Sequence, residues 1–267
     1  MKKENTVFKV LENKKINNDF FLLEIQSEKK LLPVLPGQFI QVQIPHNKTF
    51  LRRPISVFDV NMNKNTIQLL IKIVGEGTKE LSKLKINCLL DIIYPLGNPF
   101  TLPEPLENKS LNNFNFLITG GGCGIAPLYF LFSFLKNYNP NIVYDITFLL
   151  GFRNKESIFL IEEFKNVKNV YYTTDDGSYG EKGTVLNHSI WKNNDIKFDK
   201  IYTCGPEPMI KSVADYAIKN NIDCEVSLEN LMACGVGACL CCVRNTTGGH
   251  KCVCTEGPVF NAKDIFF

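Results

Sequence analysis

Six of the ten cysteines in this 267-residue chain lie within residues 234–254. Thiols crowded in this way are typical of a metal site in a reducing compartment, whereas disulfide frameworks are typical of small secreted proteins. The first ten residues, MKKENTVFKV, turn polar too soon for a signal peptide, and no stretch approaches the roughly 18 consecutive apolar residues of a membrane span. We therefore expect a cytoplasmic protein without a membrane segment, whose C-terminal part is organised by a metal centre.

Three of these cysteines show the C-x4-C-x2-C spacing of plant-type [2Fe-2S] proteins, which take a fourth ligand from a distant cysteine: Cys234, Cys239 and Cys242. Gly235 and Gly237 let the backbone between the thiols curl close to a cluster, where amide N–H groups can donate to sulfur. The fourth ligand is Cys252 or Cys254. Residues two apart on an extended chain point to the same side, so this alternation does not choose between them.

Structural zinc bound by four of these thiolates is the alternative. Zinc sites favour two C-x2–4-C pairs of similar shape, and one triplet with a single distant cysteine fits that pattern poorly. The spacing therefore favours a two-iron cluster over zinc. Cys241, adjacent to Cys242, is expected to face away from the metal.

The chain before the cysteines shows two kinds of pattern. Up to residue 103, short apolar stretches alternate with Gly, Pro and Asn turns, which predicts a β-sandwich or barrel. The clearest predicted strands are Phe20–Ile25, Phe39–Ile44 and Ile67–Ile73. From Asn113, strands alternate with helices, one of them near Glu156–Phe164, which predicts a parallel α/β sheet. The predicted parts are residues 1–103, 104–226 and 227–267.

Two motifs in the β-rich part are candidates for flavin binding. Arg53-Pro54-Ile55-Ser56 lies between predicted strands; an arginine can clamp a pyrophosphate, and a serine hydroxyl can reach the edge of a flavin ring. Gly77-Thr78 lies at a predicted helix start, where backbone N–H groups can receive phosphate. Ordinary structure explains each motif equally well, as an edge strand containing a proline and as a capped turn.

Two motifs in the α/β part follow predicted strands, at the strand ends where open parallel sheets bind ligands. The glycine-rich stretch Gly120–Gly124 matches neither the Rossmann fingerprint nor the P-loop, and a tight strand–helix turn is the alternative. Cys204 could approach a nicotinamide ring, although a buried structural cysteine is also common. The candidate NAD-binding residues are Gly121, Gly122, Gly124, Cys204, Gly205 and Pro206.

The order of these motifs resembles the ferredoxin–NADP reductase superfamily: Arg-Pro-x-Ser, then Gly-Gly-Gly-x-Gly-Ile-Ala-Pro, then Cys-Gly-Pro-x-x-Met. The fold that this resemblance implies is an N-terminal Greek-key FAD-binding β-barrel, a central parallel α/β NAD-binding domain and a small C-terminal [2Fe-2S] subdomain. Within it, Met232–Cys239 together with Cys254–Phe260 resembles the electron-transfer subunits of type B dihydroorotate dehydrogenase.

The resemblance also implies site residues. The implied cluster ligands are Cys234, Cys239, Cys242 and Cys254. The implied FAD contacts are Arg53, Pro54, Ile55, Ser56, Leu70, Ile71, Lys72, Gly77 and Thr78. Lys72 keeps the charge of an arginine often found there in the family, but not its bidentate geometry. Three cysteines stand where the family often carries other residues: Cys123, Cys241 and Cys252.

The implied activity is that of an NAD-linked oxidoreductase subunit in de novo pyrimidine (UMP) synthesis. Electrons from the FMN of a dihydroorotate dehydrogenase catalytic subunit would pass through [2Fe-2S] and FAD to NAD+, within a heterotetramer of two plus two chains. No acid–base pair for dihydroorotate is recognisable, so no catalytic residue is assigned and a partner is required. An exposed cluster loop, with the apolar Val259–Phe260 near it, is the expected docking face, and His188 is expected at the surface or in a helix.

Other functions remain as alternatives. A related flavin/iron–sulfur NAD(P) oxidoreductase subunit, linked to ferredoxin or sulfide, shares the flavin motifs, and a non-enzymatic zinc-binding module is the remote case. The near balance of 30 basic and 27 acidic residues argues against nucleic-acid binding. The sequence leaves both NAD and NADP open as the nucleotide.

Overall fold

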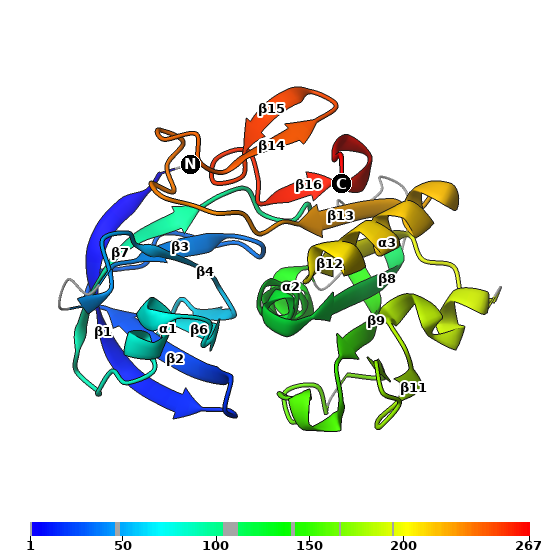
Figure 1. Cartoon of the computed structure of the whole chain (residues 1–267), viewed down its shortest axis with the longest axis horizontal. Coiled ribbons are helices and arrows are strands. Elements are labelled where there is room, and N and C mark those ends of the chain that lie inside the picture. The colour runs from blue at the N-terminus through cyan, green and yellow to red at the C-terminus, as the bar shows by residue number, and fades with distance from the viewer. Residues whose placement is uncertain (1, 46–48, 104–111, 140–141, 166, 194) are drawn as a thin grey trace. The chain divides into compact units, whose positions relative to one another are not determined.

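Antiparallel and parallel strands segregate into two units of the chain in this computed structural model (Figure 1). The structure describes residues 2–45, 49–103, 112–139, 142–165, 167–193 and 195–267. Unit 1 comprises residues 1–100 and 229–259, and unit 2 comprises residues 101–228 and 260–267. The predicted boundary after residue 103 adjoins residues 104–111, which lie outside the described residues. The division into three parts therefore stays a prediction.

Seven strands form the antiparallel sheet of unit 1, in the order β4-β3-β7-β1-β2-β6-β5. They are β1 (Glu4–Lys15), β2 (Phe20–Ser27), β3 (Phe39–Val42), β4 (Arg53–Ser56), β5 (Asp59–Asn61), β6 (Thr66–Lys72) and β7 (Leu89–Leu96), with the short helix α1 (Glu76–Leu81) after β6. The edge strand β4 contacts β6, near the other edge, so the sheet curls back on itself. Phe8, Leu23, Ile40 and Ile67 are fully buried in its core. The predicted β-barrel and its three strands are confirmed.

The C-terminal segment of unit 1 has more regular structure than its sequence suggests. A hairpin joins β14 (Val243–Thr246) to β15 (Gly249–Cys252), and β16 (Val259–Asn261) follows. The segment is attached to the turn after β7, where the Asn98 N–H donates to the Gly257 carbonyl (2.5 Å) and the Asn98 side-chain amide donates to the Glu256 carbonyl (2.9 Å). A methyl group on Gly97 would lie 2.4 Å from Pro258, so the two backbones pack closely there.

Unit 2 contains a second seven-stranded sheet, in the order β11-β10-β9-β8-β12-β13-β16. Its strands are β8 (Asn112–Gly121), β9 (Ile142–Phe152), β10 (Asn169–Thr174), β11 (Glu181–Lys182), β12 (Lys200–Cys204) and β13 (Asp223–Ser227), with β16 at the edge. The pairs from β11 through β13 are parallel, as predicted. The chain adds β9 and β10 on one side of β8 and later returns to add β12 on the other, so the topological switch point lies between β8 and β12.

Two helices cover this parallel sheet. They are α2 (Ile125–Tyr138) and α3 (Glu207–Lys219). A methyl group on Gly120 would meet Leu128 of α2, whereas one on Gly121 would approach Met209 of α3. Successive strand residues point to opposite faces, so α2 and α3 lie on opposite faces of the sheet. The remaining helical turns are 3₁₀: η2 (Gly122–Gly124), η3 (Lys155–Ser157), η4 (Val185–Asn187), η5 (Ser189–Lys192) and η6 (Ala262–Asp264).

The helix predicted near Glu156–Phe164 is wrong. Only η3 forms there, and Leu160 has a φ of +62°, which a right-handed helix cannot contain. Phe159, Leu160 and Phe164 are buried from a loop instead, and the rings of Phe164 and Phe148 lie 4.9 Å apart. None of the helices within the described residues is long and apolar enough to cross a membrane.

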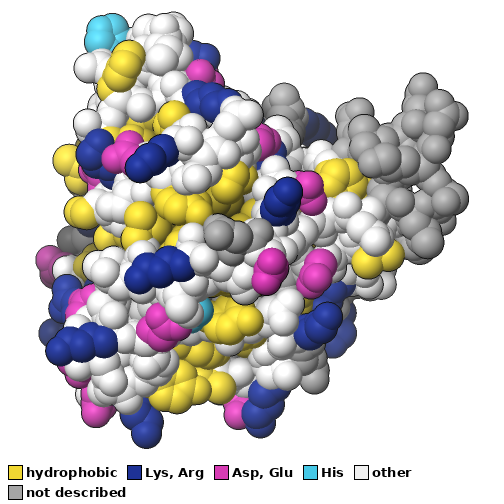
Figure 2. Space-filling model, turned by 90° about the vertical axis from the view of Figure 1, so that its right-hand side faces the viewer, with side chains coloured by type: hydrophobic (Ala, Val, Ile, Leu, Met, Phe, Trp, Pro, Cys, Tyr) yellow, Lys and Arg dark blue, Asp and Glu magenta, His cyan; other side chains and the backbone are white. Residues whose placement is uncertain are grey.

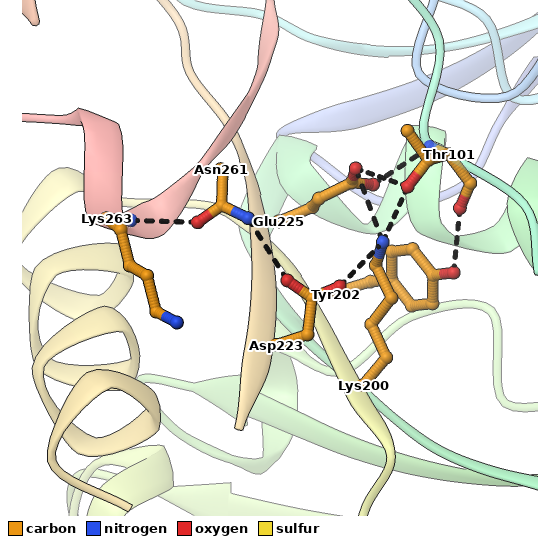
Figure 3. A network of polar contacts seen from close by, with 7 residues as sticks. All are labelled: Thr101, Lys200, Tyr202, Asp223, Glu225, Asn261 and Lys263. Atoms are coloured by element: carbon orange, nitrogen blue, oxygen red, sulfur yellow. Dashed lines mark hydrogen bonds and ion pairs between the residues drawn. The ribbon is translucent and has the colours of Figure 1, made fainter. Parts of the chain in front are cut away.

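A polar network in unit 2 holds the segments by which the chain enters and leaves this unit (Figure 3). The Glu225 carboxylate is 6% exposed and accepts hydrogen bonds from the Thr101 N–H (2.9 Å) and hydroxyl (2.5 Å). The Lys200 ammonium lies 3.1 Å from Asp223 and 3.4 Å from Glu225, and Asn261 donates to Asp223 (3.1 Å). The buried charge of Glu225 is thus compensated, which stabilises both attachments.

Candidate cofactor sites

The predicted flavin residues come together from three elements of unit 1. Arg53–Ser56 form β4, Leu70–Lys72 end β6, and Gly77 and Thr78 lie in α1. Strand β4 contacts β6, and a methyl group on Gly77 would lie 2.9 Å from Nε of Arg53. The Arg53 guanidinium therefore lies against the bare backbone of Gly77, in a space that any larger residue at Gly77 would fill.

Arg53, at the start of β4, and Arg52, just before it, have different surroundings. Arg52 is ion-paired with Asp91 on β7 (3.0 Å) and also donates to the Asp91 carbonyl (2.8 Å). Arg53 donates to the backbone carbonyl of Leu51 (2.7 Å) and has no acidic partner among the residues that the structure describes. Arg53 is thus the arginine of this pair whose charge remains available to an anionic ligand such as a pyrophosphate.

Thr78 stabilises the turn that positions α1. Its hydroxyl accepts the N–H groups of Val74 (2.9 Å) and Gly75 (3.2 Å) and donates to the Gly75 carbonyl (3.1 Å). Gly75 is the N-cap of the helix, and Thr78 is three residues further on. The predicted capped turn is therefore confirmed, while a contact of Thr78 with FAD stays a prediction.

Lys72 ends β6 beside two other groups of unit 1. Its ammonium lies 5.9 Å from the ring centroid of Phe20. Glu229 retains an exposed surface, yet burial among its neighbours raises the pKa of its carboxyl, and the positive charge of Lys72 opposes that rise. Lys72 thus places positive charge at the end of β6, close to the start of the cysteine segment.

The four predicted cluster cysteines form two pairs. The Cys239 N–H donates to Sγ of Cys234 (3.4 Å), and the Cys254 N–H donates to Sγ of Cys242 (3.4 Å). A two-iron cluster takes two protein ligands on each iron, so its ligands also fall into two pairs. The thiols therefore fit a binuclear cluster.

Backbone N–H groups of the loop act on the thiols. Burial would raise the pKa of Cys234, but the N–H groups of Val236 and Cys239 lower it to about 6. Burial raises the pKa of Cys254 to about 12, and neighbouring Cys242 adds to this effect. Because the thiolate is the form that binds metal, the N–H groups of the loop favour the form of Cys234 that ligation requires.

The structure places both candidates for the fourth ligand beside Cys242. Sγ of Cys254 also accepts the N–H of Gly237, in the loop between the other ligands. Cys252 is buried next to Cys242, while Cys241 is exposed. Gly237 has a φ of +84°, in the left-handed region that favours glycine, which agrees with the predicted curling of this loop.

Val259–Phe260 add no exposed surface beside the cluster loop, so that part of the expected docking face is wrong, while docking on the loop itself stays a prediction. Val259 is 7% exposed and Phe260 is 8% exposed, because both belong to β16 at the edge of the second sheet. The exposed apolar side chains of the cysteine segment are instead Leu231 (81%), Leu240 (64%) and Val236 (42%).

The two predicted nucleotide turns interlock at the switch point of the parallel sheet. Cys204 is paired with Gly120 on the neighbouring strand, and a methyl group on Gly124 would lie 2.2 Å from the Cys204 carbonyl. Gly205 has a φ of +154°, and a methyl group there would lie 3.0 Å from the Gly121 carbonyl oxygen. The structure thus brings both motifs together at the strand ends where open parallel sheets bind ligands.

Individual residues of these turns differ in how accessible they are to a ligand. Gly122 has a φ of +58°, and a methyl group there would meet nothing within 4 Å. The backbone of Gly122 is therefore open to a close approach. Cys204 is 2% exposed, and Pro206 is the N-cap of α3. A contact between the Cys204 sulfur and a nicotinamide stays a prediction.

A pocket of about 420 Å³ opens at the opposite end of the same sheet. Ile142 and Tyr144, at the start of β9, and Leu135, near the end of α2, help to line it. The glycine turn instead lies at the far end of β8, next to Gly151 of β9. The pocket therefore has no part in the predicted nucleotide site.

Gln41 is a buried polar residue that the motifs do not identify. It lies on β3, opposite Pro54 of β4, and is 0% exposed. Neither its Nε2 nor its Oε1 has a hydrogen-bond partner in the described structure. A glutamine inside the apolar run Phe39–Ile44 is the only sequence signal that could have identified it.

Charges of both signs lie on the surface shown in Figure 2. On the face shown in Figure 2, basic and acidic side chains are interspersed around patches of hydrophobic ones. Nucleic-acid-binding domains instead concentrate basic residues on one face.

Comparisons with known proteins agree with the three sites. A family model described as the iron-sulfur cluster binding domain of dihydroorotate dehydrogenase B matches residues 229–266. Models of an oxidoreductase FAD-binding domain and an oxidoreductase NAD-binding domain match residues 7–100 and 118–215. The expected cofactor set of FAD, an iron–sulfur cluster and NAD is thereby confirmed.

Two solved structures share the fold. One, titled as an NADH-dependent reduced ferredoxin-NADP oxidoreductase, is 30% identical with a TM-score of 0.83, and the match covers 98% of this chain and 91% of that one. The ferredoxin-NADP+ reductase of Plasmodium falciparum is 23% identical with a TM-score of 0.62, over 81% of this chain and 93% of that one.

Curated relatives match over nearly the whole chain. The dihydroorotate dehydrogenase B (NAD(+)), electron transfer subunit of Caldanaerobacter subterraneus subsp. tengcongensis is 41% identical over 263 residues, or 97% of each chain. The protein of the same name from Fusobacterium nucleatum is 35% identical over 261 residues, or 96% of each chain. The chain therefore belongs to the family of dihydroorotate dehydrogenase B (NAD(+)) electron transfer subunits.

Proposed function

We propose that this chain passes electrons from a dihydroorotate-oxidising partner to NAD+, as the electron-transfer subunit of an NAD-linked dihydroorotate dehydrogenase in pyrimidine synthesis. The paired arrangement of four cysteines, in a segment that matches the iron–sulfur family model, is the observation that carries the proposal. When bound, the [2Fe-2S] cluster supplies one-electron transfer and FAD supplies hydride transfer, which together link a one-electron donor to a two-electron acceptor.

The residues of this chain bind and orient the cofactors. Cys234, Cys239, Cys242 and Cys254 would hold the cluster, and their pairing suits a two-iron centre. Amide N–H groups of the loop donate to these sulfurs and tune the metal.

The flavin and the nucleotide are held in different ways. Arg53, which has no acidic partner in the described structure, would bind the pyrophosphate of FAD, and β4 and the end of β6 would hold the rest of the cofactor. The backbone of the glycine turn, open at Gly122, allows NAD+ to approach the switch point closely.

A separate catalytic subunit completes the reaction. No pair of groups suited to acid–base chemistry on dihydroorotate occurs in the candidate sites, so the FMN that oxidises dihydroorotate belongs to that partner. We propose a cytoplasmic complex of two plus two chains. The partner docks on the apolar side chains exposed in the cysteine segment, Leu231, Val236 and Leu240, next to the exposed Cys239.

Reconstitution tests this function. The chain, purified anaerobically with its catalytic partner, should contain about two irons, two sulfides and one FAD per chain, and should form NADH from dihydroorotate and NAD+. The partner alone should oxidise dihydroorotate with an artificial dye but form no NADH. A complex that holds both cofactors and yet forms no NADH contradicts the proposal, and zinc in place of iron contradicts the cluster assignment.

The match to the NADH-dependent ferredoxin-NADP oxidoreductase structure supports a second candidate, a ferredoxin-linked electron carrier. The same preparation, offered reduced ferredoxin with NAD+ or NADP+ in place of dihydroorotate, distinguishes the two. Pyridine nucleotide reduction with ferredoxin, and none with dihydroorotate plus the catalytic partner, favours the second candidate.

A further inference from the structure

Gln41 is the buried polar side chain of unit 1 that most needs a ligand. All four residues of β3 are buried, and Gln41 is 0% exposed with both amide atoms unpartnered in the described structure. A buried donor or acceptor without a partner costs about 1–3 kcal/mol. Buried polar groups in folded proteins are nearly always satisfied, so this carboxamide calls for a partner outside the polypeptide.

The carboxamide of Gln41 lies against the cluster loop. A methyl group on Gly235 would lie 2.6 Å from Nε2 of Gln41, so the side chain packs directly on the backbone of the residue after Cys234. Gly235 has a φ of +70°, in the left-handed region. The absence of a Cβ at Gly235 is therefore needed for this contact, and glycine also tolerates the left-handed backbone there.

Strand geometry shows that the cysteine segment covers this face of β3. Phe39 and Gln41 are two residues apart, so both side chains point to the same face. Phe39 lies 3.0 Å from the position of a methyl group on Gly97, and Pro258 lies 2.4 Å from that position. The face is thus covered at two points by the segment 229–259, at Gly235 and at Pro258.

The opposite residue on β4 is Pro54, one of the predicted FAD residues. Directly opposed residues of antiparallel strands share a face. Gln41 therefore lies between the strand expected to hold the flavin and the loop expected to hold the cluster.

We propose that Gln41 is a positioning residue for the iron–sulfur cluster, whose Nε2 donates a hydrogen bond to a sulfur atom of the cluster. This inference rests on the proposed function, in which residues 234–254 bind that cluster. A hydrogen bond to a cluster sulfur stabilises the reduced form, which carries more negative charge, and so raises the reduction potential. Gln41 would thus favour acceptance of an electron by the cluster.

Gln38 provides a matched control. It is also 0% exposed and lies just before β3, but its amide is satisfied by the protein. Its Oε1 accepts the Leu35 N–H (2.8 Å), and its Nε2 donates to the Gly97 carbonyl (2.7 Å). Replacing Gln38 therefore breaks hydrogen bonds within the protein without removing a donor to the cluster.

The test compares Gln41→Met with Gln38→Met in the complex that contains its cofactors. Methionine keeps the length of the side chain but cannot donate. In an EPR-monitored redox titration, Gln41→Met should lower the midpoint potential by about 28 mV or more, which is a threefold change in the one-electron equilibrium at about 59 mV per tenfold. Gln38→Met should lower the thermal midpoint and leave the potential unchanged.

Removing a donor that truly has no partner would instead stabilise the protein. An unchanged potential in Gln41→Met with a full complement of iron, together with a raised thermal midpoint, would overturn the proposal. A bridging buried water, the other possible partner, predicts the same unchanged potential with a lower thermal midpoint, which also overturns it.

A second measurement covers the case in which Gln41→Met does not assemble. Wild-type protein labelled with nitrogen-15 in its glutamine side chains should show a nitrogen-15 coupling to the reduced cluster in pulsed EPR, and Gln38→Met should retain it. Absence of that coupling in protein with a full cluster overturns the inference. A wild-type chain that binds no cluster would instead contradict the proposed function.

Discussion

The cysteine segment of unit 1 and the nucleotide turns of unit 2 are built in opposite ways. In the cysteine segment, side chains form the site, since four thiols in two pairs are the groups that would hold a cluster. In unit 2 the site is formed by backbone, and it depends on glycines that lack a side chain. A methyl group on Gly124 would lie only 2.2 Å from the Cys204 carbonyl, and one on Gly122 would face open space.

This difference determines how each site fails. A site made of thiolates depends on individual atoms, and because metal binding contributes folding free energy, loss of a ligand also loosens the segment around it. A site made of backbone depends on the close packing of two backbone segments, here the two nucleotide turns. One added carbon is enough to separate them. Substitutions can therefore test the thiolate site and the backbone site separately.

The largest effect is expected at the fourth cluster ligand. Cys254→Ala should lose nearly all cluster iron and visible absorbance, because Cys254 is paired with Cys242 and also accepts the Gly237 N–H. Cys252→Ala should keep the cluster. Iron and sulfide analysis of anaerobically purified protein makes the comparison, with the exposed Cys241→Ala as a further control. Loss of iron in Cys252→Ala but not in Cys254→Ala would reverse the assignment.

The backbone-built site should respond next most strongly. Gly124→Ala should destabilise unit 2 by about 2–3 kcal/mol through overpacking against the Cys204 carbonyl, and it should abolish NADH binding. Gly122→Ala meets no atom but must hold a φ of +58°, so its expected cost is only about 1–2 kcal/mol. Denaturant unfolding and NADH titration measure both. Equal losses in the two variants would show that close packing does not govern this turn.

A side chain in the flavin site should have a smaller effect. Arg53→Ala should weaken FAD binding about 10- to 100-fold, since a hydrogen bond to a charged group contributes about 1.5–3 kcal/mol. Arg52→Ala removes an ion pair with a half-exposed Asp91 and should change stability by about 0–1 kcal/mol without affecting FAD affinity. Flavin release followed by fluorescence gives both affinities. A larger loss of FAD in Arg52→Ala would contradict the role of Arg53.

The same contrast explains what could be predicted from the sequence. Short apolar stretches between turns, strand–helix alternation and thiol spacing are local patterns, and they predict both sheets and the three-cysteine motif. Burial by a distant segment leaves no such pattern. The sequence places the apolar Val259–Phe260 beside an exposed cluster loop, but both side chains are buried because β16 joins the second sheet.

Two further differences between prediction and structure also arise from features that leave no local pattern in the sequence. Apolar spacing predicts a helix over Glu156–Phe164, but the positive φ of Leu160 has no signal in that spacing. Gln41 stands among apolar residues of β3, and only the position of Gly235, nearly two hundred residues later, shows what its amide faces. Motifs of reactive residues are thus easier to predict than the residues that surround them.

The smallest expected effect involves a side chain of unit 2 outside the nucleotide turns. His188 is 5% exposed, contrary to the surface or helix position expected from its sequence. Its Nδ1 accepts the Ile190 N–H (3.0 Å), so Nε2 carries the proton and faces Glu181 at 3.3 Å. Burial lowers the pKa of His188, although Glu181 opposes this shift.

Because the pKa is lowered on folding, the unfolded chain takes up the proton first as the pH falls below about 6.5. The stability of unit 2 should therefore be full above that pH and decline progressively below it. The decline between pH 7.5 and 5.5, measured by denaturant unfolding, should be smaller in His188→Asn, whose amide oxygen can still accept from Ile190. The exposed His250 on β15 provides the control, and His250→Asn should keep the wild-type decline. An identical decline in all three proteins would mean that a group other than His188 controls acid stability.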